Sequence, residues 1–121
     1  MTDEEFSKLV AEGIDAVPEE HAKFMENVAI VYADDPTPEQ IQKLHLRKHS
    51  LLLGLYEGIP KVNRQNYNLA LPDKITIFKN PIIEYCGGDP ERIKFQVAKT
   101  IQHEIAHHFG FNEHEVRSKN L

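Results

Sequence analysis

The sequence predicts one α+β domain, in which a small twisted mixed sheet packs on helices. The chain has 121 residues, enough for a single domain with its own core, and we expect residues 1–121 to form one unit. Short runs rich in β-branched residues lie in the middle of the chain. A long, uninterrupted helical pattern lies near its C-terminal end, so helices and strands are expected in separate parts of the sequence.

Two helix starts come first. Thr2 and Glu5 have the spacing of a capping box, in which each side chain accepts a hydrogen bond from the other's backbone N–H. The helix that follows carries four apolar residues on one side: Phe6, Leu9, Val10 and Ile14. The stretch "VPEE" at residues 17–20 predicts a second helix with Pro18 at its first position, where a missing N–H costs nothing.

The first strand is expected at "NVAIVYA", residues 27–33. This run of β-branched and aromatic residues predicts a strand that is buried in the sheet. After it, in the loop "DDPTPEQ", Thr37 and Gln40 have capping-box spacing and predict another short helix, which extends to about Leu46.

Two further strands are predicted before the long helix. "SLLLGLYEGIP" at residues 50–60 is apolar but interrupted by glycine and proline, which favours a strand that runs into a turn. "KVNRQNYNLALP" at residues 61–72 is polar and is expected to be a surface loop. "KITIFKNP" at residues 74–81 alternates apolar and polar side chains and ends with Pro81 in a loop, the pattern of a half-buried or edge strand.

The long helix has recognisable ends. Asp89 is a favoured N-cap residue and Pro90 a favoured first helical residue. Nothing interrupts the helical pattern through Phe109, and Gly110 stands where a left-handed residue would end the helix. A last helical segment, "NEHEVRSK" at residues 112–119, is expected after it.

Composition excludes several classes of partner. The formal net charge of −5 argues against nucleic acid and anionic membrane surfaces, which require clustered Lys and Arg. The one cysteine, Cys86, leaves no intramolecular disulfide and is expected to be a small buried hydrophobe. No apolar run approaches the roughly 18 residues of a membrane span, and the acidic first residues do not resemble a signal peptide. We therefore expect a reduced, cytoplasmic protein with no nucleic-acid or membrane partner.

Histidines gather in "QHEIAHHFGFNEH", residues 102–114. On a helical wheel, one row of the long helix faces the core: Ile93, Val97, Ile101, Ile105 and Phe109, joined by Ala98. His103 and His107 fall on nearly the opposite side, one turn apart and about 40° from each other. Glu104 lies between the histidines and the apolar row, so a carboxylate adjoins two potential metal ligands.

The spacing of these side chains fits zinc chemistry. Two imidazoles one turn apart can both place a ring nitrogen about 2.0–2.1 Å from one Zn²⁺. Glu104 points to a different azimuth, so it is better placed to take a proton from a water on the metal than to bind the metal. A catalytic zinc needs a third protein ligand, and both Glu113 and His114 lie within reach once Gly110 has ended the helix. The alternative is a pair of solvated surface histidines.

The sequence also resembles a known family. "HEIAHHFGFNE" fits HExxHxxGxx followed by an acidic residue, the aspzincin-like variant of the metzincin motif. With "LLLGLYEGIP" and "LPDKITIFKNPI", in this order and in a chain of this length, it resembles the small bacterial zincin-like metallopeptidases, the minimal zincins. The resemblance covers nearly the whole chain, from about Phe6 to Arg117. It implies a reduced zincin fold, with the motif on an active-site helix and no separate lower domain.

This resemblance implies a role for each motif residue. His103 and His107 would be zinc ligands, and Glu104 would be the general base. Glu113 would be the third ligand, where other members carry Asp or His, and the adjoining His114 is the alternative. The cofactor would be Zn²⁺ and the substrate a peptide or protein. The Met-turn of metzincins is missing, because both methionines precede the motif.

The resemblance also suggests where the substrate binds. In zincins the strand before the active-site helix pairs with an extended substrate, which would place Ile77, Phe78 and Lys79 near it; an ordinary sheet strand is the alternative. The oxyanion of the scissile carbonyl needs a hydrogen-bond donor besides the metal. The sequence does not choose among five candidates: Tyr56, Tyr67, Tyr85, His114 and Arg117.

We therefore predict a zinc-dependent metallopeptidase, with two alternatives. One is a catalytically silent zincin-like module that binds a partner protein, since so small a chain has little wall for a deep specificity cleft. The other is a metal-dependent endoribonuclease, because enzymes of ribosomal RNA maturation have three histidines at this spacing. Those enzymes lack a glutamate after the first histidine and carry His at the last position, so Glu104 and Glu113 both disfavour that class.

Overall fold

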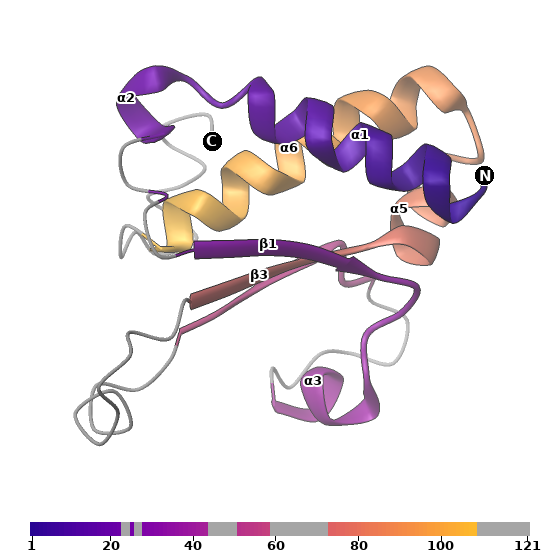
Figure 1. The fold of residues 1–121 in the computed structure, drawn as a ribbon. Coiled ribbons are helices and arrows are strands. Elements are labelled where there is room, and N and C mark those ends of the chain that lie inside the picture. The colour runs from indigo at the N-terminus through magenta and orange to yellow at the C-terminus, as the bar shows by residue number, and fades with distance from the viewer. Residues whose placement is uncertain (23–24, 26–27, 44–50, 59–72, 109–121) are drawn as a thin grey trace.

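A computed structural model describes residues 1–22, 25, 28–43, 51–58 and 73–108 (Figure 1). The elements in chain order are α1 (Asp3–Asp15), α2 (Glu19–Ala22), β1 (Val28–Ala33), α3 (Pro38–Lys43), β2 (Gly54–Glu57), β3 (Asp73–Phe78), α5 (Lys79–Tyr85) and α6 (Pro90–His108). Helices and a small mixed sheet thus share the chain, and the long helix is the last described element. The predicted α+β class is confirmed.

The sheet has three strands in the order β1-β3-β2. β1 pairs with β3 in parallel, so that Ile30 lies opposite Ile75. β2 pairs with β3 in the antiparallel direction, so that Gly54 lies opposite Ile77. Among the described strands, β3 is therefore central, and β1 and β2 are the two edges.

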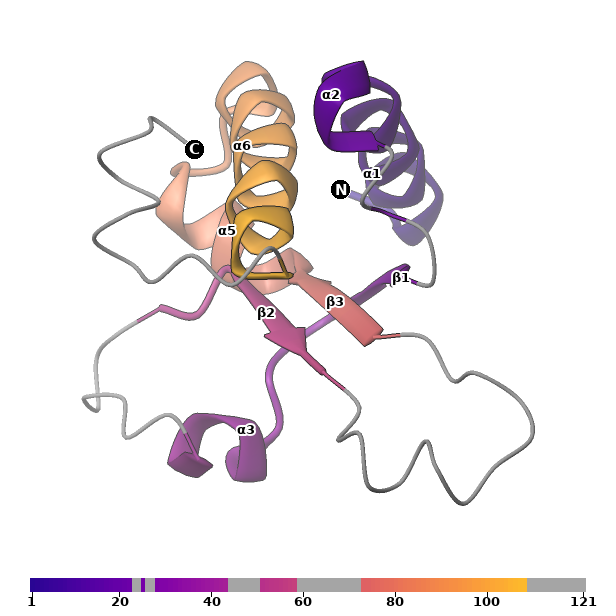
Figure 2. The same ribbon diagram turned by 90° about the vertical axis from the view of Figure 1, so that its left-hand side faces the viewer.

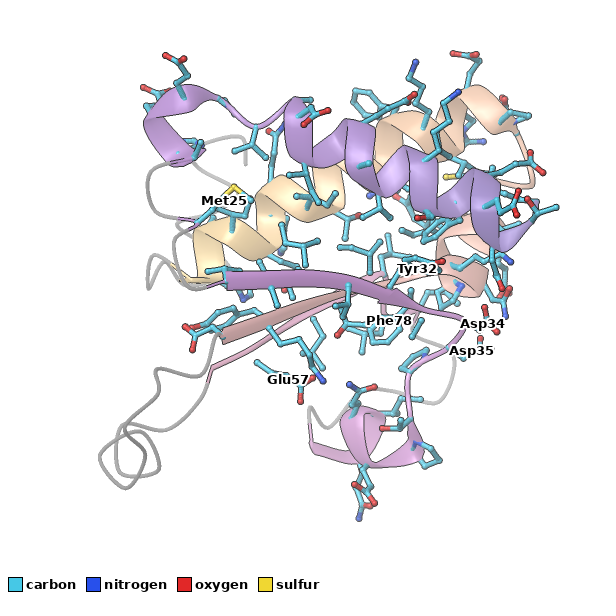
Figure 3. All side chains as sticks on the ribbon, in the orientation of Figure 1. Met25, Tyr32, Asp34, Asp35, Glu57 and Phe78 are labelled. Carbon is cyan, nitrogen blue, oxygen red and sulfur yellow. The ribbon has the colours of Figure 1, made fainter. Side chains whose placement is uncertain are left out.

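Two helices cover one face of this sheet (Figures 1 and 2). α1 and α6 pack against each other above the strands, and α6 contacts both β2 and β3. The core between these layers is apolar and contains Phe6, Val10, Val17, Ile75, Ile77, Ile82, Cys86, Ile93, Val97, Ile101 and Ile105. On the opposite face lies α3, whose Gln40 Nε2 donates a hydrogen bond of 3.1 Å to Glu57 Oε1 of β2 (Figure 3). The sheet is thus held from both sides.

The predicted capping box of α1 is confirmed. Glu5 N donates to Thr2 Oγ1 at 3.1 Å, and Thr2 N donates to Glu5 Oε1 at 3.2 Å. The backbone and side-chain hydrogen bonds with Thr2 lower the pKa of Glu5 below its ordinary value. One turn into α1, Phe6 is fully buried and meets the ring of Tyr32 on β1 edge to face, with centroids 5.6 Å apart. This contact ties α1 to the sheet.

The predicted start and core face of α6 are also confirmed. Asp89 Oδ1 accepts a hydrogen bond from Glu91 N at 3.1 Å, and Pro90 is the first helical residue. The buried row consists of Ile93, Val97, Ile101 and Ile105, as the helical wheel predicted. The last member of that predicted row, Phe109, lies outside the described residues.

The prediction that residues 27–33 form a strand is confirmed, but the prediction that this strand is buried is wrong. β1 lies at an edge of the sheet, and the exposed fractions of Val31 and Tyr32 are 40% and 36%. An apolar run without alternation is also found in an edge strand whose second face is only partly covered, so the pattern did not identify its position.

The prediction of a strand within residues 74–81 is confirmed by β3, but the prediction that this strand is half-buried or at an edge is wrong. β3 is the central strand, and its Ile75, Thr76, Ile77 and Phe78 are all buried, so both of its faces are covered. The alternation of apolar and polar residues in its sequence arises from Thr76, which is buried, and does not mark a face of the strand that is exposed to solvent. Phe78 lies on the face toward α3, opposite to the face that α1 and α6 cover (Figure 3).

The sequence did not predict α5. Pro81, expected in a loop, lies in the first turn of this short helix, where its missing N–H is not needed. Ile82 and Cys86 are buried against the core, and burial raises the pKa of the Cys86 thiol, as befits the small hydrophobe that was predicted. Gly87 and Gly88, with φ of 62° and 76°, then turn the chain into α6 in a conformation that favours glycine.

Some predicted features lie outside the described residues, namely the third helix beyond residue 43 to Leu46, the loop at 61–72, Gly110 and the segment 112–119. The second helix begins at Glu19, one residue later than predicted, and the Pro18 carbonyl accepts its first hydrogen bonds. Within the described ranges, no helix has the length and apolar character needed to cross a membrane.

Candidate metal centre

The two histidines at ligand spacing lie on the last turns of α6. A separation of four residues places His103 and His107 one above the other on the helix. Their ring centroids are 5.0 Å apart and the ring planes are inclined by 40°. The side chain of His103 is 26% exposed, so both solvent and a metal ion can reach this face of the helix.

This separation fits a shared zinc ion. With a Zn–N bond of about 2.0–2.1 Å, the centroid of a ligating imidazole lies roughly 3.2 Å from the ion. Two centroids 5.0 Å apart then subtend about 100° at the metal, close to the tetrahedral angle that zinc prefers. The donor set is also suitable, because neutral imidazole is a common zinc ligand.

Glu104 lies beside this pair but points into the protein. The residue is only 6% exposed, and a carboxylate is seldom buried this deeply without a partner or a function. Its Oε2 lies 4.0 Å from Nε2 of His103. The Glu104 stem occupies the space between α6 and Gly54 of β2. Helical periodicity had placed this residue between the histidine face and the apolar row, which agrees with its burial.

The predicted third ligands, Glu113 and His114, lie outside the described residues. Within the ranges that are described, no group of three or more His, Cys, Asp and Glu side chains could hold a metal ion. The described part of the chain pairs His103 with His107 and places Glu104 beside His103. A third ligand would have to come from elsewhere, and the sequence places its candidates just after α6.

The structure describes two of the five candidate oxyanion donors, and neither is placed to act at the histidine pair. Tyr56 of β2 donates its phenolic proton to Asp73 Oδ2 at 2.7 Å, so this proton is not directed at a substrate carbonyl. Tyr85 is 55% exposed and lines a surface groove together with Phe95 of α6. Phe95 lies about 12 Å along the helix from His103, so this groove is remote from the histidine pair. The other three candidates, Tyr67, His114 and Arg117, lie outside the described residues.

Of the two interpretations of residues 75–80, the ordinary sheet strand is confirmed and pairing with a substrate is not. β3 is hydrogen-bonded to a strand on each side, so Ile77 and Phe78 offer no free edge to an extended peptide. Lys79 is the first residue of α5, and its Nζ lies 2.8 Å from Asp3 Oδ1 on α1. Of the strands that the structure describes, β2 combines an edge position with extensive contact to α6.

Sequence reasoning missed two parts of this region. Gly54 had been interpreted only as a break in an apolar run, whereas it lies directly against α6. Asp73 had been assigned no role, yet it is buried and accepts the Tyr56 hydrogen bond. No local pattern links Tyr56 and Asp73, because they are 17 residues apart and meet only across the β2–β3 pair.

Comparison with known proteins adds an independent observation. No curated protein gives a significant match to the chain. The sequence model of one protein family, described as zincin-like metallopeptidase, matches residues 25–120. This match spans the three described strands, the helix α6 and the predicted third ligands. The chain therefore belongs to the zincin-like metallopeptidase family.

Proposed function

We propose that this protein is a zinc-dependent metallopeptidase formed by one domain, residues 1–121. The observation that carries the proposal is the pairing of His103 and His107, with ring centroids 5.0 Å apart, beside a buried Glu104. Membership of the zincin-like metallopeptidase family supports the same activity class. A peptidase of this family acts on a peptide or protein substrate.

In this proposal three side chains hold the ion. His103 and His107 supply ring nitrogens from one face of α6, and Glu113 supplies a carboxylate, with His114 as the alternative. When bound, Zn²⁺ would polarise the scissile carbonyl and acidify the attacking water. The 5.0 Å separation of the two rings supports a shared ion rather than two separate ones.

Glu104 would carry the proton. Its carboxylate accepts a proton from the attacking water and then delivers it to the nitrogen of the departing amine, so the base is regenerated at the end of the reaction. Two features support this role. The Glu104 carboxylate oxygen lies 4.0 Å from His103 Nε2, near enough to share a water with the metal. Its burial keeps bulk water away, which strengthens its electrostatic interactions.

The substrate would lie along β2. Among the described strands, β2 is hydrogen-bonded only to β3, so its other side can pair with an extended peptide through main-chain hydrogen bonds. A Cβ atom at Gly54, the first position of β2, would lie 3.2 Å from Glu104 Cγ, so a peptide on this edge would pass close to the proposed base.

Zinc binding is the first test. The purified protein should retain about one Zn²⁺ per chain after gel filtration, measured by mass spectrometry of the metal. His103→Ala together with His107→Ala should abolish that binding, because both ring ligands are gone. His21→Ala is the matched control, since this histidine lies on α2, and it should leave the zinc content unchanged. Full zinc retention by the double variant would refute the proposed centre.

Hydrolysis is the second test. Glu104→Gln should keep zinc and lower peptide cleavage by about 10²–10⁴-fold, the usual contribution of a general base. Glu91→Gln is the control, because Glu91 is exposed on the first turn of the same helix. Cleavage of a peptide library by Glu104→Gln at the wild-type rate would contradict the assignment. A zinc-loaded wild type that cleaves no peptide would instead favour the catalytically silent binding module.

A further inference from the structure

The helix α6 packs against the edge strand β2 and lies close to Gly54. A Cβ atom at this position would lie 2.6 Å from Thr100 Cγ2 and 3.2 Å from Glu104 Cγ. It would also lie 3.4 Å from the carbonyl oxygen of Thr76 on β3. The first two distances are shorter than ordinary carbon–carbon contacts, so only a residue without a side chain fits here as the elements now stand.

Neither element can easily move away. Gly54 is paired with Ile77 in the sheet, and the residue before it is held by a hydrogen bond of 2.9 Å from Phe78 N to the Leu53 carbonyl. On the helix side, Ile101 and Ile105 are buried in the core beneath α1 and above the sheet. Moving α6 outward by the width of a methyl group would open this core, which is costly.

We infer that Gly54 is a positioning residue for Glu104: the missing side chain sets how deeply the glutamate stem lies between α6 and β2. This inference rests on the proposed function of Glu104 as the base. Thr100 and Glu104 are one helical turn apart and both buried, so a side chain at residue 54 would meet both of them on one face of α6. The strand thereby fixes where the carboxylate lies relative to His103.

The contact that a Cβ at residue 54 would make with Glu104 is close to the carboxylate. It is made by Cγ of Glu104, the atom bonded to the carboxyl carbon, so a displacement of Cγ is passed on to the carboxylate. A Cβ at 3.2 Å requires that this stem shift by a few tenths of an ångström. Catalytic groups tolerate displacements of roughly 0.5 Å, and a misplacement of about 1 Å can cost 10²-fold in rate.

Gly54→Ala alone is not a clean test, because its nearest contact is with Thr100 and the fold itself could suffer. Thr100→Ser removes the Cγ2 methyl and keeps the hydroxyl that accepts a hydrogen bond from Gln96 Nε2 at 3.0 Å. The combination Gly54→Ala with Thr100→Ser thus removes the 2.6 Å contact and leaves the one with Glu104. Thr100→Ser alone is the matched reference.

We expect the combined variant to fold like Thr100→Ser and to bind the same amount of zinc. Its kcat for peptide cleavage should fall about tenfold, with KM within about twofold, because only the base is displaced. In NMR spectra, the Glu104 methylene shifts and side-chain couplings should change, while the signals of α1 should not. Equal kcat and unchanged Glu104 signals, relative to Thr100→Ser, would overturn the inference.

The two proposals fail in different ways. A wild-type protein that cleaves no peptide would refute the proposed activity, whereas the NMR comparison needs no catalysis and still tests whether residue 54 sets the Glu104 conformation. Loss of zinc in the combined variant would also overturn the inference, because residue 54 would then affect the position of the histidines and not of Glu104 alone.

Discussion

The position of α6, and with it the candidate metal centre, depends on how closely α1 approaches it at Gly13. A Cβ atom at Gly13 would lie 2.8 Å from Ile101 Cδ1 and 3.3 Å from Ala98 Cα. Alanine at this helical position gains up to about 1 kcal/mol in intrinsic propensity over glycine. Overpacking a dense core costs about 1–3 kcal/mol. We therefore expect Gly13→Ala to lower the free energy of unfolding by about 1 kcal/mol, within a range of roughly 0–2.

Ile101→Val separates the two contributions. It deletes the Cδ1 atom that the new methyl group would meet, and by itself it should cost about 0.5–1.5 kcal/mol because Ile101 is fully buried. In the double variant, the methyl of Ala at position 13 fills the space that Cδ1 has left. We expect the double variant to be more stable than the sum of the single effects by about 1 kcal/mol. The contact with the Ala98 backbone remains and limits the recovery.

The assay is urea unfolding of the four proteins at 25 °C, followed by far-ultraviolet circular dichroism. Gly13→Ala combined with Ile93→Val is the control cycle, because Ile93 lies two turns away on the same buried row and should give additive effects. Additivity within about 0.5 kcal/mol in the Ile101 cycle would refute the steric account of the α1–α6 spacing.

Two further predictions concern the helix starts. Asp89→Ala should lower the free energy of unfolding by about 1 kcal/mol in the same urea assay, because Glu91 N loses its acceptor. Asp89→Asn should keep nearly all of the wild-type stability, because asparagine is an equally good N-cap residue. Equal losses for both variants would exclude capping as the cause. In a ¹³C NMR titration, Glu5 should have a pKa below its ordinary 4.5, and Thr2→Ala should return it toward that value. Because the pKa of Glu5 is lower in the folded state, its contribution to stability is present above pH 4.5 and is lost as the pH falls through the folded-state pKa. A stability difference between wild type and Thr2→Ala that is the same above and below this pH range would contradict the prediction.

Features that depend on neighbours along the chain were predictable. The capping box of Thr2 and Glu5 and the cap at Asp89 depend on side chains that reach only two or three residues along the backbone. The buried row of α6 and the shared face of His103 and His107 follow from 3.6 residues per turn. The sequence by itself therefore determined the long helix α6, the pairing of two imidazoles on it and the place of Glu104 beside them.

Features that depend on distant segments were not predictable from pattern. Apolar periodicity indicates which face of a strand is covered, but it does not indicate which strands lie beside it. For this reason residues 74–81 were predicted to form a half-buried or edge strand, although β3 is central. Pairing in the order β1-β3-β2 also made β2 an edge strand in contact with α6 and brought Tyr56 to Asp73. The closeness of Gly54 to Glu104 arises only from the packing of α6 on that strand. The distance between two backbones depends on how the whole core packs, so no single stretch of sequence predicts it.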